Sequence, residues 1–258
     1  MKPFSYSIIA LILFASCEKE IRMDLRSVEP QLVIEGLIPL DSAAKVRLTT
    51  SKDFFADHIY PPVENAVVTV SDDAGNSETL HLSPSGWYEA SSLTGVEGRT
   101  YYLNVETDGK TYSSVSTMPY SVPVDSVGMY YIPAFQEAFP MVYFTDPKGV
   151  DNYYRFFLSI NGKKMPGVDI DSDEERDGKR VNHIMPFEDR YNDDKGIEKG
   201  DTILIEIQYI SKDAFQFFLT LAMMGMSNAN PDSNIEGGAL GYFSAYSFNQ
   251  SRIVANWR

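Results

Sequence analysis

Alternating apolar and polar positions run through the first half of the chain beyond residue 30. In residues 99–106, the apolar side chains Tyr101, Leu103 and Val105 occupy every second position. Side chains of a β-strand point to opposite faces in turn, so this spacing predicts a strand with one buried face. The same period predicts strands at residues 31–38, 45–51, 65–71, 77–82, 87–90, 99–106 and 110–117.

Turn-forming residues separate these predicted strands. Asp and Gly occur at residues 73–76 and 108–109, and Pro84 and Gly86 mark another turn. About seven short strands in roughly 90 residues fit an immunoglobulin-like β-sandwich. We therefore predict that residues 30–118 form a first domain of this type.

The second half also alternates between apolar and polar positions. Pro119 and Pro123 predict a joint after the first domain, and residues 124–258 are predicted to form a second β-rich domain. Asn161 and Gly162 form a two-residue hairpin signal. Strands are predicted at residues 125–131, 141–145, 153–160, 201–210, 239–248 and 252–257.

One segment changes to a helical period. In residues 212–226, apolar side chains such as Phe215, Phe218 and Leu219 recur three to four positions apart. This predicts one helix near residues 212–226, capped by Ser211 or Asp213. The predicted fold class is thus mainly β, with an N-terminal immunoglobulin-like sandwich and a second β-rich domain that contains one helix.

The first 17 residues have the anatomy of a bacterial lipoprotein signal. Lys2 precedes an apolar run at residues 8–14, and two small residues stand directly before Cys17. The run is too short to span a bilayer as a stable helix, so residues 1–16 are predicted to be a signal peptide. Cys17 is predicted to be acylated and to anchor the chain to a membrane. An ordinary secretory signal with an incidental cysteine is the alternative.

Acidic residues follow this cysteine directly. Glu18, Lys19 and Glu20 resemble the surface-export signal of Bacteroidota lipoproteins. This predicts an outer-membrane protein that faces the cell exterior. Residues 17–29 are predicted to be a lipidated tether that holds the body off the membrane.

Composition narrows the set of partners. The chain has 36 Asp and Glu against 22 Lys and Arg, which gives a net charge of −14. Phosphate recognition needs a basic surface, so no nucleic-acid partner is expected. The single cysteine excludes internal disulfides and a cysteine-based zinc site.

No catalytic motif stands out in the sequence. There is no Gly-x-Ser-x-Gly elbow and no phosphate-binding loop. The three histidines, His58, His81 and His183, have no neighbour at metal-binding spacing and are expected to be structural. The protein is therefore predicted not to be an enzyme. Carboxylate pairs for glycoside hydrolysis need only spatial closeness, so the sequence leaves that alternative open.

An acidic insertion is the candidate metal site. Asp169, Asp171, Asp173 and Asp177 lie within one short segment, and carboxylates at alternate positions can converge on Ca²⁺. The EF-hand pattern fails, because the glycine comes too late and the terminal Glu is missing. Calcium is the candidate cofactor, and a solvated loop without any cofactor is the alternative.

A polar loop after the predicted helix is the candidate binding loop. Its side chains offer many hydrogen-bonding groups, and its glycines permit close approach of a backbone. The candidate residues are Asn230, Asp232, Asn234, Gly237, Gly238 and Tyr242. A structural turn between helix and strand is the alternative. The aromatic residues of segment 53–62 are a further candidate, either as a docking surface or as a cap on the first sandwich.

Five short stretches together resemble one known family, the Bacteroidota lipoproteins described as domain of unknown function 4249. They are CEKE at 17–20, LVIEG at 32–36, PVENA at 62–66, VEGRTY at 96–101 and NIEGGALGYF at 234–243. The resemblance covers essentially the whole mature chain. It implies an accessory role beside a TonB-dependent outer-membrane receptor, in surface capture or nutrient uptake. It implies no catalytic residues.

The leading functional hypothesis is therefore a non-enzymatic, surface-exposed lipoprotein that captures ligand for a TonB-dependent receptor or docks on it. Two alternatives come from other classes: a lipid-anchored hydrolase acting on glycans or peptides, and a structural or adhesive surface protein.

Overall fold

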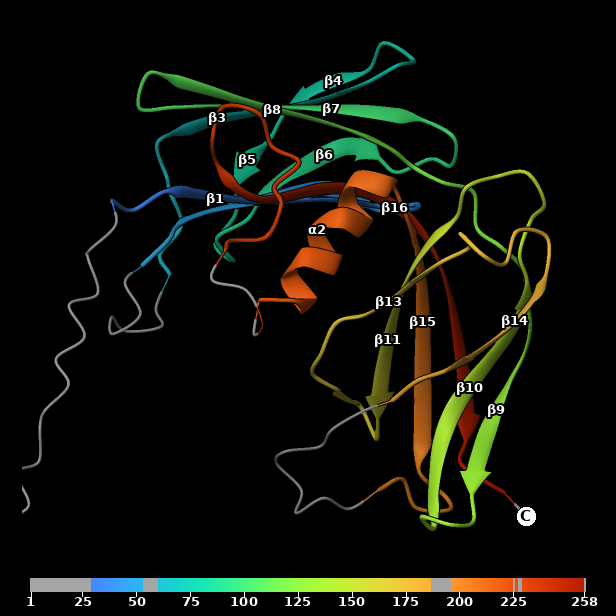
Figure 1. Ribbon diagram of the computed structural model, residues 1–258. Helices are drawn as coiled ribbons and strands as arrows, with labels where there is room; N and C mark the ends of the chain where they lie inside the picture. The colour runs from blue at the N-terminus through green and yellow to red at the C-terminus, as the bar shows by residue number, and fades with distance from the viewer. Residues whose placement is uncertain (1–28, 53–59, 187–195, 225, 227–228, 258) are drawn as a thin grey trace, which may run out of the picture.

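The computed structural model describes residues 29–52, 60–186, 196–224, 226 and 229–257 of the chain. Cys17, Glu18, Lys19 and Glu20 lie outside this described part, as do residues 53–59 of the aromatic segment. The described residues form strands in three sheets and the helix α2 (Figure 1). The prediction of a mainly β fold is confirmed, and the immunoglobulin-like type of its first half stays a prediction.

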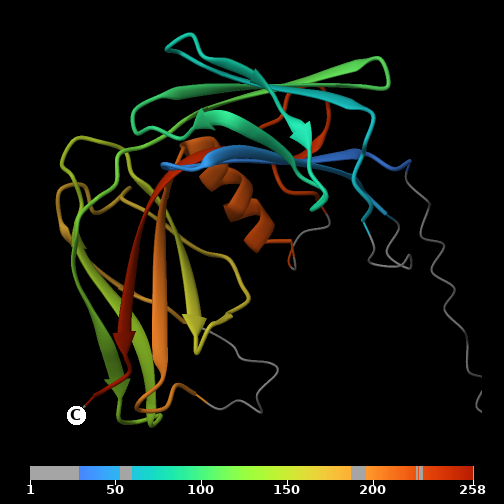
Figure 2. The same cartoon turned by 180° about the vertical axis from the view of Figure 1, so that it is seen from behind.

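The first half of the chain packs two sheets face to face. One layer contains β1 (Leu32–Pro39), β2 (Ala43–Thr50), β6 (Tyr88–Thr94) and β5 (His81–Leu82). The facing sheet has the order β4 (Ser77–Thr79), β3 (Ala66–Asp72), β7 (Thr100–Thr107) and β8 (Lys110–Thr117). Figure 2 shows the two layers one above the other, seen from behind.

The predicted alternation produces the core of this first sandwich. Tyr101, Leu103 and Val105 of β7 are all buried, and they pack with residues such as Ile34 and Leu48 of the opposite layer. Burial of apolar side chains from both inner faces is the main stabilising contribution to such a sandwich. Segment 77–82, predicted as one strand, is two short strands, because β4 pairs with β3 of one sheet and β5 pairs with β6 of the other.

The second half builds another pair of facing sheets. Strands β9 (Val124–Ile132), β10 (Glu137–Thr145) and β14 (Arg180–Ile184) form a sheet of three. It faces β11 (Tyr153–Ile160) and β15 (Thr202–Ile210), with β12 (Lys163–Lys164) and β13 (Asp169–Ser172) at the edge of β11. Phe144, Tyr154 and Ile205 lie buried in the core between them.

One long strand belongs to both halves. β16 (Leu240–Val254) pairs in parallel with β1 along residues 240–246 and antiparallel with β15 along residues 247–254. Two separate strands were predicted here, and the structure has a single one. Its close approach to β1 requires Gly241, since a Cβ at this position would lie 2.0 Å from the Ile34 carbonyl oxygen.

The helix α2 (Lys212–Ala222) packs on the outer face of the sheet that contains β11, β13 and β16. Ser211 caps it by accepting a hydrogen bond from the Ala214 N–H at 3.4 Å. The helix ends four residues earlier than predicted. Apolar spacing continues to Met226, but this side chain is 88% exposed and has no surface to pack against.

Candidate functional site

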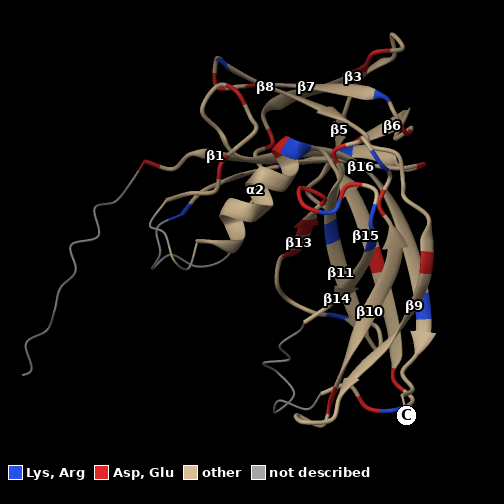
Figure 3. Cartoon of the chain, turned by 45° about the vertical axis from the view of Figure 1, so that its right-hand side comes forward, with Lys and Arg blue, Asp and Glu red and all other residues tan. Residues whose placement is uncertain are grey.

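The acidic insertion lies along one side of the second sandwich. It was predicted as a loop, but it begins with strand β13 and leads into strand β14. β13 pairs with β11 of one sheet, whereas β14 pairs with β10 of the facing sheet. The insertion therefore connects the edges of the two sheets. In Figure 3 the turn after β13 carries both acidic and basic residues.

Asp169 and Asp171 hold a histidine between them. As alternate residues of β13 they point to the same side. His183 of β14 has its Nε2 atom 3.1 Å from the Asp169 carboxylate and its Nδ1 atom 3.3 Å from Asp171. Arg176 adds a second positive charge through an ion pair with Asp171. We call these four residues the histidine cluster.

The histidine cluster fixes the charge of its imidazole ring. Burial disfavours the charged form of His183, but hydrogen bonds and ion pairing with Asp169 and Asp171 outweigh burial and raise its pKa to about 9. The ring also stacks on Phe156, with 3.8 Å between ring centroids. At neutral pH the imidazole is thus a cation that donates from both nitrogens. It has no free lone pair with which to act as a general base.

A second carboxylate group lies at the other end of the same insertion. Ligand oxygens of Asp146, Asp173 and Asp177 lie within 4.8 Å of one another, and we call these residues the triple-Asp cluster. Asp146 directly follows β10 and is 2% exposed, Asp173 is 7% exposed, and Asp177 is exposed.

Hydrogen bonds hold all three members of the triple-Asp cluster, and the one to Asp173 comes from the backbone of Asn152. The buried Tyr154 hydroxyl donates to Asp146, which also accepts the Gly178 N–H at 3.1 Å. Asp177 accepts the Gly149 N–H at 2.5 Å. Asp146 and Asp173 are both buried, so this pair presents no accessible acid or base to a polymeric substrate.

The structure divides the four predicted metal ligands into two groups. Asp169 and Asp171 face His183, while Asp173 and Asp177 join Asp146. Sequence reasoning missed Asp146, which lies more than twenty residues upstream of the insertion. Its position directly after a predicted strand was the available signal, but a pairing between β10 and β14 was needed to bring it here.

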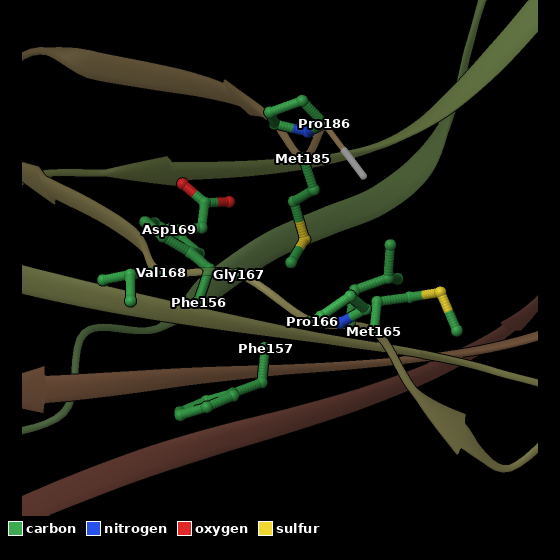
Figure 4. A pocket seen from close by; sticks show the side chains of 10 residues that line it. Phe156, Phe157, Met165, Pro166, Gly167, Val168, Asp169, Met185 and Pro186 are labelled. Carbon is green, nitrogen blue, oxygen red and sulfur yellow. The ribbon is translucent and has the colours of Figure 1, made fainter. Parts of the chain in front are cut away.

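A small pocket adjoins the histidine cluster. Its volume is about 120 Å³, and β11, the connection from β12 to β13, and the residues after β14 form its wall. In Figure 4 the Met185 side chain lies between Asp169 on one side and Met165 and Pro166 on the other. The wall is mostly apolar, with the Asp169 carboxylate as its charged group.

The candidate binding loop packs on the first sandwich. The Asn234 side chain accepts the Phe243 N–H at 2.9 Å and donates to the Phe243 carbonyl at 2.8 Å. Gly237 adopts a φ of +95° against strand β8, where a Cβ would lie 2.6 Å from the Thr111 carbonyl oxygen. The structure thus gives both residues structural contacts.

The other residues of this loop differ in their surroundings. Asp232 accepts a hydrogen bond from Gln216 of α2 at 3.2 Å. The Tyr242 hydroxyl donates to Glu35 at 3.3 Å, and burial raises the pKa of Tyr242. Asn230 and Gly238 are exposed. The contacts of these residues are thus with different neighbours, and their role as a binding loop stays a prediction.

No helix among the residues that the structure describes is long and apolar enough to cross a membrane. A family model described as "Domain of unknown function (DUF4249)" matches residues 18–252. None of the curated proteins compared with the chain matches it.

Proposed function

This chain belongs to the DUF4249 family, and from that premise we propose that it is a surface-exposed lipoprotein of the outer membrane, anchored through Cys17. The observation that carries the proposal is where the family match begins. It starts at residue 18, directly after the cysteine that follows the predicted signal peptide. A shared mature region that begins beside an acylated cysteine fits a family of lipid-anchored proteins.

We propose further that the protein is a non-enzymatic partner of a TonB-dependent receptor in nutrient uptake, as an accessory subunit or a ligand-capture protein. A tether of residues 17–29 would span at most about 45 Å when fully extended. The body would therefore work close to the membrane, within reach of a receptor in the same bilayer.

The histidine cluster does not supply the general base that the hydrolase alternative would need. A general base at neutral pH needs a pKa near 7 and a free lone pair, whereas His183 has a pKa of about 9 and faces two carboxylates. Substitution of His183 is accordingly expected to change the stability of the fold and not to abolish a hydrolytic activity.

Affinity purification from native envelopes tests the partnership. The tagged full chain is solubilised in mild detergent after cross-linking of intact cells, and its partners are identified by mass spectrometry. We expect a TonB-dependent receptor in stoichiometric amount. A chain that is recovered without any such receptor, with or without cross-linking, contradicts the partnership.

Cys17→Ala is the matched variant for the anchor. It removes the only acylation site and leaves the described body unchanged, so we expect a folded protein in the soluble fraction. Retention of the variant in the membrane would contradict anchoring through Cys17. Protease treatment of intact cells should digest the wild-type chain, and survival until lysis would contradict surface exposure.

A further inference from the structure

Arg155 places a half-buried positive charge on strand β11, beneath helix α2. Its Cζ atom lies 3.6 Å from the ring centroid of Phe218 on α2 and 4.4 Å from that of Phe157. The guanidinium hydrogen-bonds to the Tyr242 hydroxyl, but its buried Nε atom has no partner among the residues that the structure describes. Buried polar atoms are nearly always hydrogen-bonded, so the protein satisfies this guanidinium only in part.

A second cation lies on the same aromatic ring. The Nζ atom of Lys164 on strand β12 is 3.7 Å from the Phe157 ring centroid. The two cations are close enough to repel each other, because burial, followed by the charge of Arg155, lowers the pKa of Lys164. Lys164 is exposed and Phe157 is half-buried, so a ligand in solution can reach this pair of cations.

The nearby carboxylates are already occupied by other groups. Glu35 forms an ion pair with Arg47 at 2.6 Å, and Glu206 accepts hydrogen bonds at 2.7 Å from the side-chain amides of Gln208 and Gln250. Outside residues 53–59 and 187–195, which the structure does not describe, neither of the two cations has a carboxylate oxygen within 4.0 Å. Three cationic side chains thus face two carboxylates, which leaves one positive charge unbalanced in a chain of net charge −14.

We propose that Arg155 and Lys164 bind the carboxylate group of a ligand, while the ring of Phe157 packs against the part that carries it. A guanidinium matches a planar carboxylate, and an ammonium adds a point charge. A singly charged carboxylate balances the one excess positive charge, whereas a phosphate group brings nearly two negative charges. Acidic sugars and acidic peptides share this chemistry. The inference goes beyond the proposed function and depends neither on a receptor nor on the anchor.

Calorimetric titration of the purified full chain in detergent tests the site and distinguishes the two sources. Trigalacturonate and triglutamate are the carboxylate probes, and galactotriose and inorganic phosphate are the comparison compounds. We expect one site per chain that binds a carboxylate probe at least about tenfold more tightly than either comparison compound. Binding of trigalacturonate alone identifies an acidic sugar, and binding of triglutamate alone identifies an acidic peptide. Binding of both identifies the carboxylate itself as the recognised group.

Two substitutions assign the binding to these cations. Lys164→Gln should weaken binding of the carboxylate probe by at least about tenfold, and Arg155→Gln should abolish it. Lys110→Gln is the matched control, because it removes the same charge from an exposed residue of the first sandwich, and it should bind like the wild type. If Arg155→Gln fails to fold, the exposed Lys164→Gln still decides the result. The proposal is overturned if neither carboxylate probe binds, if phosphate binds more tightly than both, or if Lys164→Gln binds as tightly as Lys110→Gln.

Discussion

The two carboxylate groups of the acidic insertion differ in how their negative charge is balanced. In the histidine cluster, Asp169 and Asp171 have His183 and Arg176 as cationic partners. In the triple-Asp cluster, the described residues provide hydrogen bonds to Asp146, Asp173 and Asp177, and no ion pair with a cationic side chain is among the contacts of these residues. The charge of one cluster is thus balanced by cationic side chains, whereas the other cluster is held by neutral hydrogen-bond donors.

Strand geometry explains why four aspartates of one segment separate in this way. Asp169 and Asp171 are alternate residues of β13 and must point to one side. Strand β13 ends at Ser172, and the next residue, Asp173, turns into the interior. Side chains at alternate positions therefore point to the same side only as far as the strand continues.

The largest expected effect comes from making the histidine cluster resemble the triple-Asp cluster. His183→Gln leaves two partly buried carboxylates with only Arg176 to balance them. Breaking a buried ion pair by removing one partner costs about 3 kcal/mol or more, so the free energy of unfolding at pH 7 should fall by about 3 kcal/mol. Urea denaturation measures this, with His81→Gln at an exposed position as control. A loss equal to that of the control would mean that His183 carries no charge in the fold.

The stability of the fold should also depend on pH through the titration of His183. The pKa of His183 is raised from 6.5 to about 9, so the folded protein holds this proton more tightly than the unfolded chain. Its contribution is fully present below pH 6.5 and is lost as pH rises through about 9. We expect the wild type to lose about 2 kcal/mol relative to His183→Gln across this interval. Parallel curves for the two proteins would contradict the charged state.

Local patterns predicted much of the fold. The period of two placed the strands at 110–117 and 153–160 at their observed bounds, and Ser211 was among the predicted caps of the helix. These features depend on neighbours in the sequence, so a single segment contains the whole signal.

Features that depend on distant segments were not predicted. The parallel pairing of β16 with β1 joins residues about 200 positions apart, and its long continuous course combined two predicted strands into one. Asp146 reaches the triple-Asp cluster only because β10 pairs with β14. The sequence listed the acidic residues, but tertiary pairing decided which of them meet.

A smaller effect is expected from the hydrogen bond that holds Asp146. Tyr154→Phe removes the buried hydroxyl that donates to this carboxylate. Hydrogen bonds to charged groups contribute about 2 kcal/mol, so the free energy of unfolding should fall by about this amount. Tyr102→Phe, at an exposed tyrosine of the first sandwich, is the control and should change little. A Tyr154→Phe protein as stable as that control would mean that Asp146 does not need this donor.

The smallest effects should have opposite signs at two nearby residues. Asp171→Asn weakens the contacts to His183 and Arg176, so it should lower the free energy of unfolding by about 1 kcal/mol. Asp173→Asn removes a charge whose folded-state pKa is raised, which means that the fold disfavours that charge at neutral pH. Asp173→Asn should therefore raise the free energy of unfolding by about 1 kcal/mol at neutral pH. This gain should disappear as pH falls below the pKa of Asp173. Urea denaturation of the two variants beside the wild type measures both changes. Two variants that shift the free energy of unfolding in the same direction would show that the two clusters balance their charge in the same way.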